Sequence, residues 1–144
     1  MFPRDLIGSP RMFGIETEFF IIDKDGKISN SADEIICAAK KKLSYSSITK
    51  ECGKAMLEHL TFPHTSAKAS FDSFFKDFET LLYELESKEL GIYNMGTYPG
   101  KNTGLIRDEL RYKMQQKILG KDQFGAAIKC IGLHFHYTLP RRSF

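Results

Sequence analysis

Two segments at opposite ends of the chain each carry a pair of possible metal ligands at alternating positions. Glu16 and Glu18 stand near the start of the 144 residues, and His134 and His136 stand near the end. Side chains of a β-strand alternate between its two faces, so residues two positions apart point the same way, about 6.5–7 Å apart. Two carboxylates on one face of a packed sheet repel each other unless a proton or a cation lies between them. This pattern is the strongest indication of function in the sequence.

A second pair of carboxylates flanks a predicted turn in the middle of the chain. Glu51 and Glu58 lie on either side of Cys52-Gly53. Their odd spacing would place them on opposite faces of one continuous strand, but a turn at Gly53 allows both side chains to face one site. The alternative for each is an ordinary surface glutamate, and the alternative for the first pair is the solvated face of a one-sided sheet.

The two histidines near the end of the chain flank Phe135 in a predicted strand. Neutral imidazole is a common metal ligand, although a single histidine in a strand is more often a core residue with satisfied hydrogen bonds. His59 and His64 are not paired in this way, and we expect them to be structural. Carboxylates together with an imidazole favour a hard cation such as Mg²⁺ or Mn²⁺, whereas zinc sites more often recruit thiolates or several histidines.

Length and composition limit the class of protein. The chain has 144 residues, 42% of them hydrophobic, and a net charge of +3, so we expect one soluble domain with a buried core. No basic stripe with interleaved aromatic residues occurs, which disfavours nucleic-acid binding. No apolar run reaches the roughly 20 residues that span a bilayer, and no secretion signal is visible. The three cysteines are widely spaced, which indicates reduced thiols in the cytoplasm, and the apolar runs around Cys37 and Cys130 predict that both are core residues.

The hydrophobic pattern predicts an α+β fold in which helices pack on a largely antiparallel sheet. The clearest element is a helix from about Ser70 to Leu90, which Gly91 ends. Its phenylalanines and leucines recur at helical spacing, and we interpret them as the core face that covers the sheet rather than a cofactor site. The other expected elements are strands over 13–22, 46–51, 54–61, 92–96 and 126–139, a short helix with a capping box at Ser31 and Glu34, and a helix over 106–119 with Ile106, Leu110, Met114 and Ile118 on one side and Gly120 at its end.

Five short motifs occur in the order seen in glutamate–cysteine ligases and the related carboxylate–amine ligases. They are Gly14–Phe19, Glu51 with Glu58, Gly96–Pro99, Arg111-Tyr112 and Gly132–Pro140. The chain resembles this family from about residue 12 to residue 140, which is nearly its whole length. The resemblance implies a glutamine-synthetase-like fold, in which a curved, mostly antiparallel sheet covered by helices carries metal ions on its concave face.

The resemblance also implies an activity and its site residues. ATP phosphorylates the γ-carboxylate of glutamate, and an amine, such as that of cysteine, displaces phosphate to form an amide. Such phosphoryl transfer depends on positioning and on cations that neutralise charge. By position in the motifs, the metal ligands are Glu16, Glu18, Glu51, Glu58 and His134, the cofactor-binding residues are His134 and His136, and the catalytic residue that meets a carboxylate or phosphate is Arg111, whose alternative is a surface arginine.

The length of the chain departs from this family, whose members are considerably longer. We therefore expect residues 1–144 to be a single domain that corresponds to the N-terminal portion of the catalytic domain, an incomplete catalytic unit with an unpaired sheet edge. Because exposed edges invite pairing with another chain, we predict a homo-oligomer or a complementing chain. The alternative is a non-catalytic module that keeps the fold and binds a metal or nucleotide, or serves in assembly.

Overall fold

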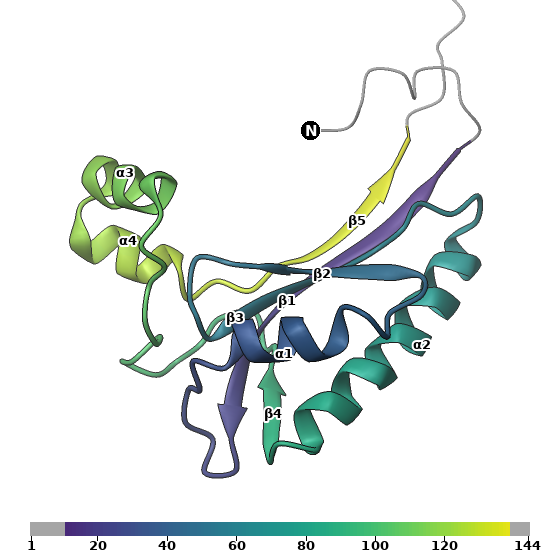
Figure 1. Cartoon of the computed structure of the whole chain (residues 1–144). Helices are drawn as coiled ribbons and strands as arrows, with labels where there is room; N and C mark the ends of the chain where they lie inside the picture. Colours follow the sequence, from purple (N-terminus) through teal and green to yellow (C-terminus); the bar gives the residue numbers. More distant parts are fainter. Residues whose placement is uncertain (1–10, 139–144) are drawn as a thin grey trace, which may run out of the picture.

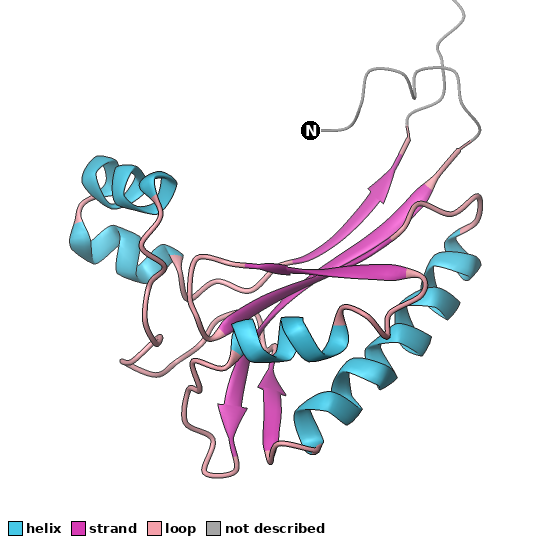
Figure 2. Ribbon diagram, viewed as in Figure 1, coloured by secondary structure: helices cyan, strands magenta, loops and turns pink. Residues whose placement is uncertain are grey.

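The first strand, β1 (Phe13–Asp23), is the longest and lies at the centre of an open antiparallel sheet (Figure 1). The computed structural model describes residues 11–138. The predicted final strand and the last motif extend beyond them, so Leu139 and Pro140 lie outside the described residues. The other elements, in chain order, are α1 (Ala32–Ala39), β2 (Ser46–Lys50), β3 (Met56–Thr61), α2 (Ala67–Glu86), β4 (Leu90–Tyr93), α3 (Leu110–Leu119), α4 (Lys121–Ala127) and β5 (Leu133–Tyr137) (Figure 2).

β1 makes contacts along both of its edges. One edge pairs with β3, which in turn pairs with β2. The other edge is shared, because β5 pairs with residues 13–17 and β4 pairs with residues 20–23. Every one of these pairings is antiparallel, which confirms the predicted α+β class with an antiparallel sheet.

Helices α1 and α2 cover one face of this sheet, and their apolar sides form the main core. Alternate residues of β1 point into this core, as the period of two predicts. Each large side chain buried in this way stabilises the fold by about 1.5–3 kcal/mol. The fully buried members include Phe19, Ile21, Ile35, Leu57, Leu81 and Leu85.

Helix α2 confirms the predicted long helix but differs at both ends. It begins at Ala67, where the hydroxyl of Ser66 accepts a hydrogen bond from the amide of Ala69 at 3.1 Å. It ends at Glu86, so Gly91 does not terminate it and lies instead in β4. The prediction failed there because Leu90, which fits the helical spacing, packs on the core from a strand.

Only part of the apolar stripe of α2 is buried. Phe78 packs edge-on against Phe19, with ring centroids 6.1 Å apart, which confirms the core role of this part of the stripe. Phe71 and Phe75, in contrast, are exposed. The interpretation as a core face is therefore correct for the C-terminal part of the helix and wrong for these two side chains.

The segment before β5 departs furthest from expectation. Residues 121–127 form helix α4, which includes the first two residues of the strand predicted over 126–139. The strand that is found, β5, begins only at Leu133. Helix α3 begins at Leu110 rather than Ile106, and Leu110, Met114 and Ile118 are exposed. The predicted inward side of this helix is therefore wrong: Tyr112 is its buried residue and packs in a small cluster with Cys52, Phe124, Ile106 and Ile128.

Smaller predictions also met mixed outcomes. Ser31 stands at the start of α1, but its hydroxyl lies 2.6 Å from that of Ser29 and makes no capping hydrogen bond. The prediction that Cys37 and Cys130 are core residues is wrong, since both are exposed and only Cys52 is buried among these three free thiols. Within residues 11–138, no helix combines the length and apolar character needed to cross a bilayer.

Candidate metal centre

The face of the sheet opposite α1 and α2 carries the predicted ligands. Glu16 of β1 stands directly opposite His134 of β5, and Glu18 of β1 stands directly opposite Glu58 of β3. Because side chains of directly paired residues point to the same face, these four groups gather along the middle of the sheet. The antiparallel register thus brings together residues that lie up to 118 positions apart in the sequence.

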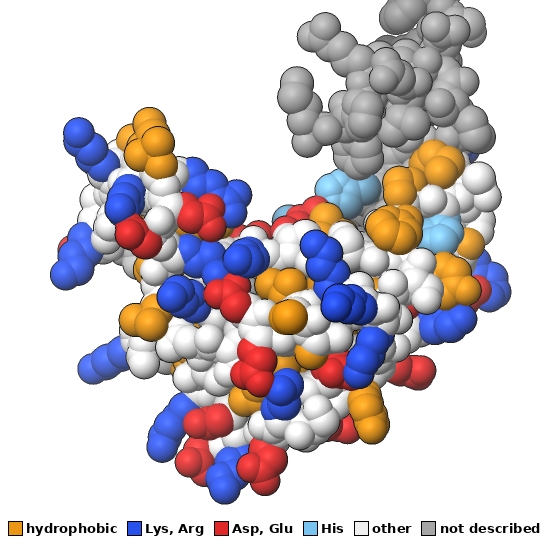
Figure 3. Space-filling view, viewed as in Figure 1, with side chains coloured by type: hydrophobic (Ala, Val, Ile, Leu, Met, Phe, Trp, Pro, Cys, Tyr) orange, Lys and Arg blue, Asp and Glu red, His pale blue; other side chains and the backbone are white. Residues whose placement is uncertain are grey.

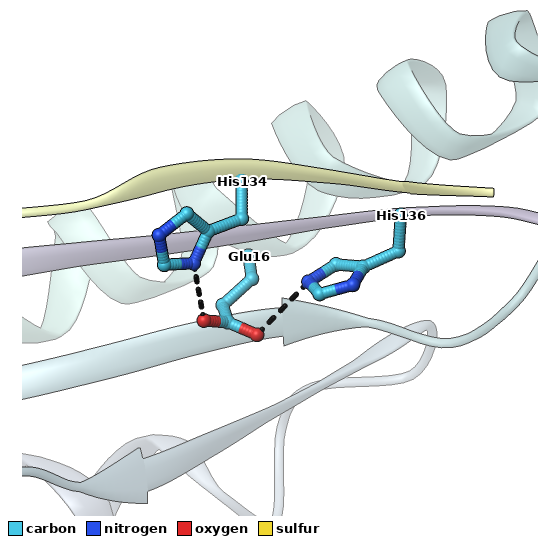
Figure 4. Close-up of side chains that lie close together, drawn as sticks. All are labelled: Glu16, His134 and His136. Carbon is cyan, nitrogen blue, oxygen red and sulfur yellow. Dashed lines mark hydrogen bonds and ion pairs between the residues drawn. The ribbon is translucent and has the colours of Figure 1, made fainter. Parts of the chain in front are cut away.

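Glu16, His134 and His136 form the closest group of possible ligands (Figure 4). Nδ1 of His134 lies 2.6 Å from Oε1 of Glu16, and Nε2 of His136 lies 3.1 Å from Oε2 of the same carboxylate. One ligand atom from each residue can be chosen so that all three lie within 4.8 Å of one another. The two rings therefore approach the carboxylate from β5 at its two oxygens.

The charges in this group support one another. Burial opposes the ionisation of Glu16, but hydrogen bonds and charge from His134 and His136 outweigh it and lower the pKa of the carboxyl. The hydrogen bond to Glu16, opposed by desolvation and assisted by the charges of Glu16, Glu18 and Glu58, raises the pKa of His134. The hydrogen bond therefore favours the ionised carboxyl of Glu16 and the protonated ring of His134 together. A cation bound by the Nδ1 atom of His134 competes with this proton.

The remaining three carboxylates, Glu18, Glu51 and Glu58, form an acidic group beside it. Burial raises the pKa of Glu58 to about 7, and the charges of Glu16 and Glu51 and a hydrogen bond with Glu51 add to this effect. Glu58 thus ionises less readily than an ordinary glutamate, chiefly because it is buried and further because its neighbours are acidic. The structure brings Glu51 and Glu58 together across the turn at Cys52-Gly53, whereas their role as metal ligands remains a prediction.

Two polar groups that the sequence analysis did not single out orient these carboxylates. The backbone amide of Gly132 donates to Oε2 of Glu18 at 2.8 Å, and the hydroxyl of Thr49 donates to Oε2 of Glu58 at 3.0 Å. Thr49 is two residues before Glu51, so the period of two in a strand was a usable signal for its side-chain direction. The role of Gly132 depends on the approach of a loop to β1 and carries no such signal.

A cavity of about 460 Å³ opens between the acidic group and the lobe formed by α3 and α4. Glu18 and Glu51 line it on the sheet side, and Arg111, Tyr112, Gln115, Leu119, Phe124 and Ile128 line it on the lobe side. Figure 3 shows acidic and histidine side chains in the hollow between this lobe and the far end of the sheet. The cavity therefore offers both charged and apolar contacts to a small molecule beside the carboxylates.

Arg111 stands on α3 at this cavity. Its Nε donates to Oε2 of Glu109 at 3.1 Å, and its guanidinium lies 4.3 Å from the centroid of the Tyr112 ring and donates to the hydroxyl of Tyr112. The side chain is 60% exposed, so an incoming anion can reach it. Its catalytic role remains a prediction.

The donor set fits divalent cations. Carboxylate oxygens are the ligands of Mg²⁺ and Mn²⁺, and the acidic group supplies three such side chains. Two imidazoles with one carboxylate, as in Glu16, His134 and His136, suit a metal that also accepts nitrogen, a group that includes Fe²⁺ and Zn²⁺ as well as Mn²⁺. His59 has no part in either group: it is fully buried on the core side and its Nε2 lies 2.7 Å from the hydroxyl of Ser46, which confirms its structural role.

Comparison with known proteins identifies the family. The sequence profile described as glutamate–cysteine ligase family 2 (GCS2) matches residues 12–143. No curated protein matches the chain. The profile covers nearly the whole sequence, and it confirms the resemblance that the five motifs indicate. The chain therefore belongs to glutamate–cysteine ligase family 2, a family of the ligase type.

Proposed function

We propose that this protein is a carboxylate–amine ligase that uses ATP and Mg²⁺ or Mn²⁺ to join glutamate to an amine such as that of cysteine. The observation that carries the proposal is the convergence of Glu16, Glu18, Glu58 and His134 on one face of the sheet, beside a cavity, in a chain of this family. Phosphoryl transfer needs little covalent chemistry from a protein and depends on positioned charge. The acidic face is suited to that task.

The proposed reaction has two steps. An oxygen of the γ-carboxylate of glutamate attacks the terminal phosphorus of ATP, ADP leaves, and an acyl phosphate forms. The amine nitrogen then attacks the acyl carbon, phosphate leaves with the electrons of the broken carbon–oxygen bond, and the amine releases a proton. A divalent cation, when bound, would neutralise the charges of the phosphates during the first step.

The residues of this chain have separate tasks in that scheme. Glu16, His134 and His136 would hold the cation next to the nucleotide, and the acidic group would hold a cation on the cavity side. Arg111, which is exposed at the cavity, would bind a carboxylate or phosphate of a substrate through its planar guanidinium. The apolar side chains of the α3–α4 lobe would limit water around the acyl phosphate.

The proposal can be tested by titration and by product release. Calorimetry with Mg²⁺ and a non-hydrolysable ATP analogue is expected to show binding by the wild type and at least tenfold weaker binding by Glu16→Gln. Glu79→Gln, an exposed carboxylate on α2, is the matched control and should bind as the wild type does. Equal affinity in all three proteins would exclude the metal site.

Release of ADP upon addition of glutamate and an amine then separates catalysis from binding. Release that requires both substrates and the divalent cation would support the ligase. Binding without ADP release, either alone or after mixing with a complementing chain, would favour the non-catalytic module instead.

The proposed assembly concerns the edge of the sheet at β5. Among the described residues, β5 pairs with β1 alone. Its side chains opposite the histidines, Leu133, Phe135 and Tyr137, are 60%, 58% and 62% exposed. An exposed apolar edge strand favours pairing with another chain, which supports the proposal of a homo-oligomer or a complementing partner.

A further inference from the structure

Arg107 is a buried arginine outside the groups described above. It precedes α3, and its side chain is only 5% exposed. Its backbone amide donates to the carbonyl oxygen of Cys52 at 2.9 Å, and its Nε donates to the carbonyl oxygen of Glu51 at 2.8 Å. One residue thus binds two consecutive carbonyl groups of the turn that carries Glu51.

These bonds belong to a short backbone connection between two distant segments. The amide of Lys54 donates to the carbonyl of Leu105 at 2.7 Å, and Gly53 and Ile106 form an isolated antiparallel bridge. Glu51 follows the last residue of β2, so the ladder of the sheet no longer holds its backbone. Oε2 of Glu51 accepts a hydrogen bond from the backbone amide of Cys52 at 3.1 Å, so the carboxylate is tied to the same turn that Arg107 holds.

The guanidinium of Arg107 is itself held from α1. Its Nη1 donates to both oxygens of Asp33, at 2.8 and 3.0 Å. Asp33 also forms an ion pair with Lys50, whose Nζ lies 3.4 Å from Oδ1. Asp33 and Arg107 thereby tie the first turn of α1 to the residues on each side of Glu51.

A contribution to folding stability does not by itself explain why an arginine is buried at this position. Nη2 of Arg107 is buried and has no hydrogen-bond partner within the described part of the chain. A buried donor without a partner opposes folding, and the ion pair with Asp33, whose side chain is 50% exposed, contributes little because solvent screens it. The useful property of the side chain is its rigid fork, which binds a backbone carbonyl and a carboxylate together.

We infer that Arg107 is a positioning residue that, through the main chain of Glu51, aims the Glu51 carboxylate at the cation site. The inference rests on the proposed metal-dependent function. Arg107 contacts the backbone of the turn, so it acts through Glu51 rather than on a substrate. Residues that orient metal ligands typically change metal affinity by about 10–100-fold when they are replaced, and this is the expected size of the effect.

The experiment measures Mn²⁺ binding by electron paramagnetic resonance for the 144-residue wild type, Arg107→Gln and Arg107→Lys. Arg107→Gln is expected to weaken Mn²⁺ binding by about 10–100-fold and to change the line shape of any bound ion. Arg107→Lys keeps the charge but has one nitrogen in place of the fork, so it should recover only part of the affinity. Leu82→Ala, which removes a partly buried side chain of α2 that packs on the main core, is the control for a general loss of stability.

A second measurement is independent of the metal. Cys52 is buried at the turn that Arg107 holds, whereas Cys37 and Cys130 are exposed, so the rate at which a thiol reagent labels Cys52 reports opening of this turn. Mass spectrometry of the peptides separates the three cysteines. Labelling of Cys52 should accelerate at least tenfold in Arg107→Gln, and much less in Leu82→Ala.

The outcomes separate this inference from the proposed function. If the wild type binds Mn²⁺ and Arg107→Gln binds it equally well, Arg107 does not position Glu51 and the metal site stands. If Leu82→Ala weakens Mn²⁺ as much as Arg107→Gln does, the effect is one of general stability and the inference is wrong. If the wild type binds no Mn²⁺, the proposed function fails and the positioning role fails with it.

Discussion

Glu18 of β1 lies directly opposite Glu58 of β3 on the sheet face that α1 and α2 leave uncovered. Like charges at directly opposed positions destabilise a sheet, and acidic side chains surround this pair. Burial, together with the charges of Glu16 and Glu51, raises the pKa of Glu58 to about 7. A proton on Glu58 or a bound cation would each relieve the repulsion between these carboxylates.

Replacement of Glu58 by glutamine should therefore have opposite effects on stability and on metal binding. The folded state favours protonated Glu58, so its contribution to stability is present below pH 4.5 and is lost as the pH rises towards about 7. After allowance for partial exposure, we expect Glu58→Gln to raise the free energy of unfolding at pH 8 by about 1 kcal/mol. Urea unfolding with and without Mn²⁺ measures both effects.

Mn²⁺ binding should increase the free energy of unfolding of the wild type much more than that of Glu58→Gln. Saturating Mn²⁺ at 100 times its dissociation constant stabilises a folded protein by about 2.7 kcal/mol. Wild type should show this gain and Glu58→Gln should lose most of it, whereas the exposed Glu79→Gln should keep it. A glutamine variant that is less stable than the wild type at pH 8, without metal, would contradict the charge repulsion argued above.

The pH dependence of Mn²⁺ binding should report the proton on His134. Hydrogen bonding and charge from Glu16 raise the pKa of this imidazole above its ordinary value of 6.5, and the cation competes with its proton. Displacement of this proton alone should raise the affinity by about tenfold per pH unit until the pKa of His134 is passed, and displacement of the proton of Glu58 adds to the rise below about pH 7. His134→Asn should bind more weakly and with a shallower slope. An affinity that does not change between pH 6 and pH 8 would exclude His134 as a ligand.

The sequence alone predicts the elements that have a clear period. Alternation in β1 separates Glu16 and Glu18 from the core side chains of Ile15 and Phe19, and this arrangement is found. The pairing of Glu16 with His134 is not predictable in the same way. The register of two strands depends on which strand pairs with the edge of β1 and on the connecting turns. The sequence around Glu16 and His134 determines neither of these.

Other features depend on tertiary contacts that no local pattern reveals. The apolar run before β5 reads equally as a strand or a helix, and α4 forms because Phe124 packs against Tyr112 and Cys52. In the sequence, Arg107 looks like an ordinary polar residue of the helix predicted over 106–119, and its burial follows from contacts with Asp33 and Glu51. The strand faces on which the candidate ligands lie were thus predictable, whereas the register of the strands and the contacts of Arg107 were not.

Gly132 should tolerate no side chain without a change at the metal centre. A Cβ atom at this position would lie 2.7 Å from both Cε1 and Nε2 of His134 and 3.4 Å from Oε2 of Glu18. The imidazole is the mobile partner, so Gly132→Ala should fold but move the ring of His134 away from Glu16. We expect a loss of at least tenfold in Mn²⁺ affinity with a small change in melting temperature.

Gly125, in α4, is the matched control for this change. A Cβ atom there meets nothing within 4 Å, so Gly125→Ala should leave Mn²⁺ binding unchanged. Nuclear magnetic resonance shifts of the His134 ring measure the displacement directly. Unchanged ring shifts in Gly132→Ala would show that the loop, not the ring, yields.

The assembly of the chain should depend on the apolar face of β5. Phe135→Lys places a charge on this edge strand, a device by which natural edges resist pairing. The wild type should sediment as a dimer or larger species, and Phe135→Lys should sediment as a smaller one. Met95→Lys, which changes an exposed loop residue away from β5, should sediment as the wild type does. A wild-type chain that sediments as a monomer without a partner would contradict self-association.

His59 should make the fold sensitive to acid through a route separate from the metal centre. The hydroxyl of Ser46 donates its proton to Asp77 at 2.7 Å, so Nε2 of His59 must donate to that hydroxyl. Nδ1 is buried and has no hydrogen-bond partner among the described residues, and a proton there would have no acceptor. Burial, only partly offset by the charge of Asp77, accordingly lowers the pKa of His59 to about 4.

This contribution to stability is complete above pH 6.5 and is lost as the pH falls towards 4, because the unfolded chain then binds the proton that the folded chain excludes. Its full size is about 3 kcal/mol. Between about pH 7 and pH 4.5, Glu58 increases the free energy of unfolding as the pH falls, which opposes the effect of His59. The measurement should therefore be made in a protein that carries Glu58→Gln. There, the free energy of unfolding from urea titrations should decrease between pH 6.5 and pH 4, and His59→Gln should flatten the decrease. Equal slopes in both proteins would mean that His59 is protonated in the folded chain.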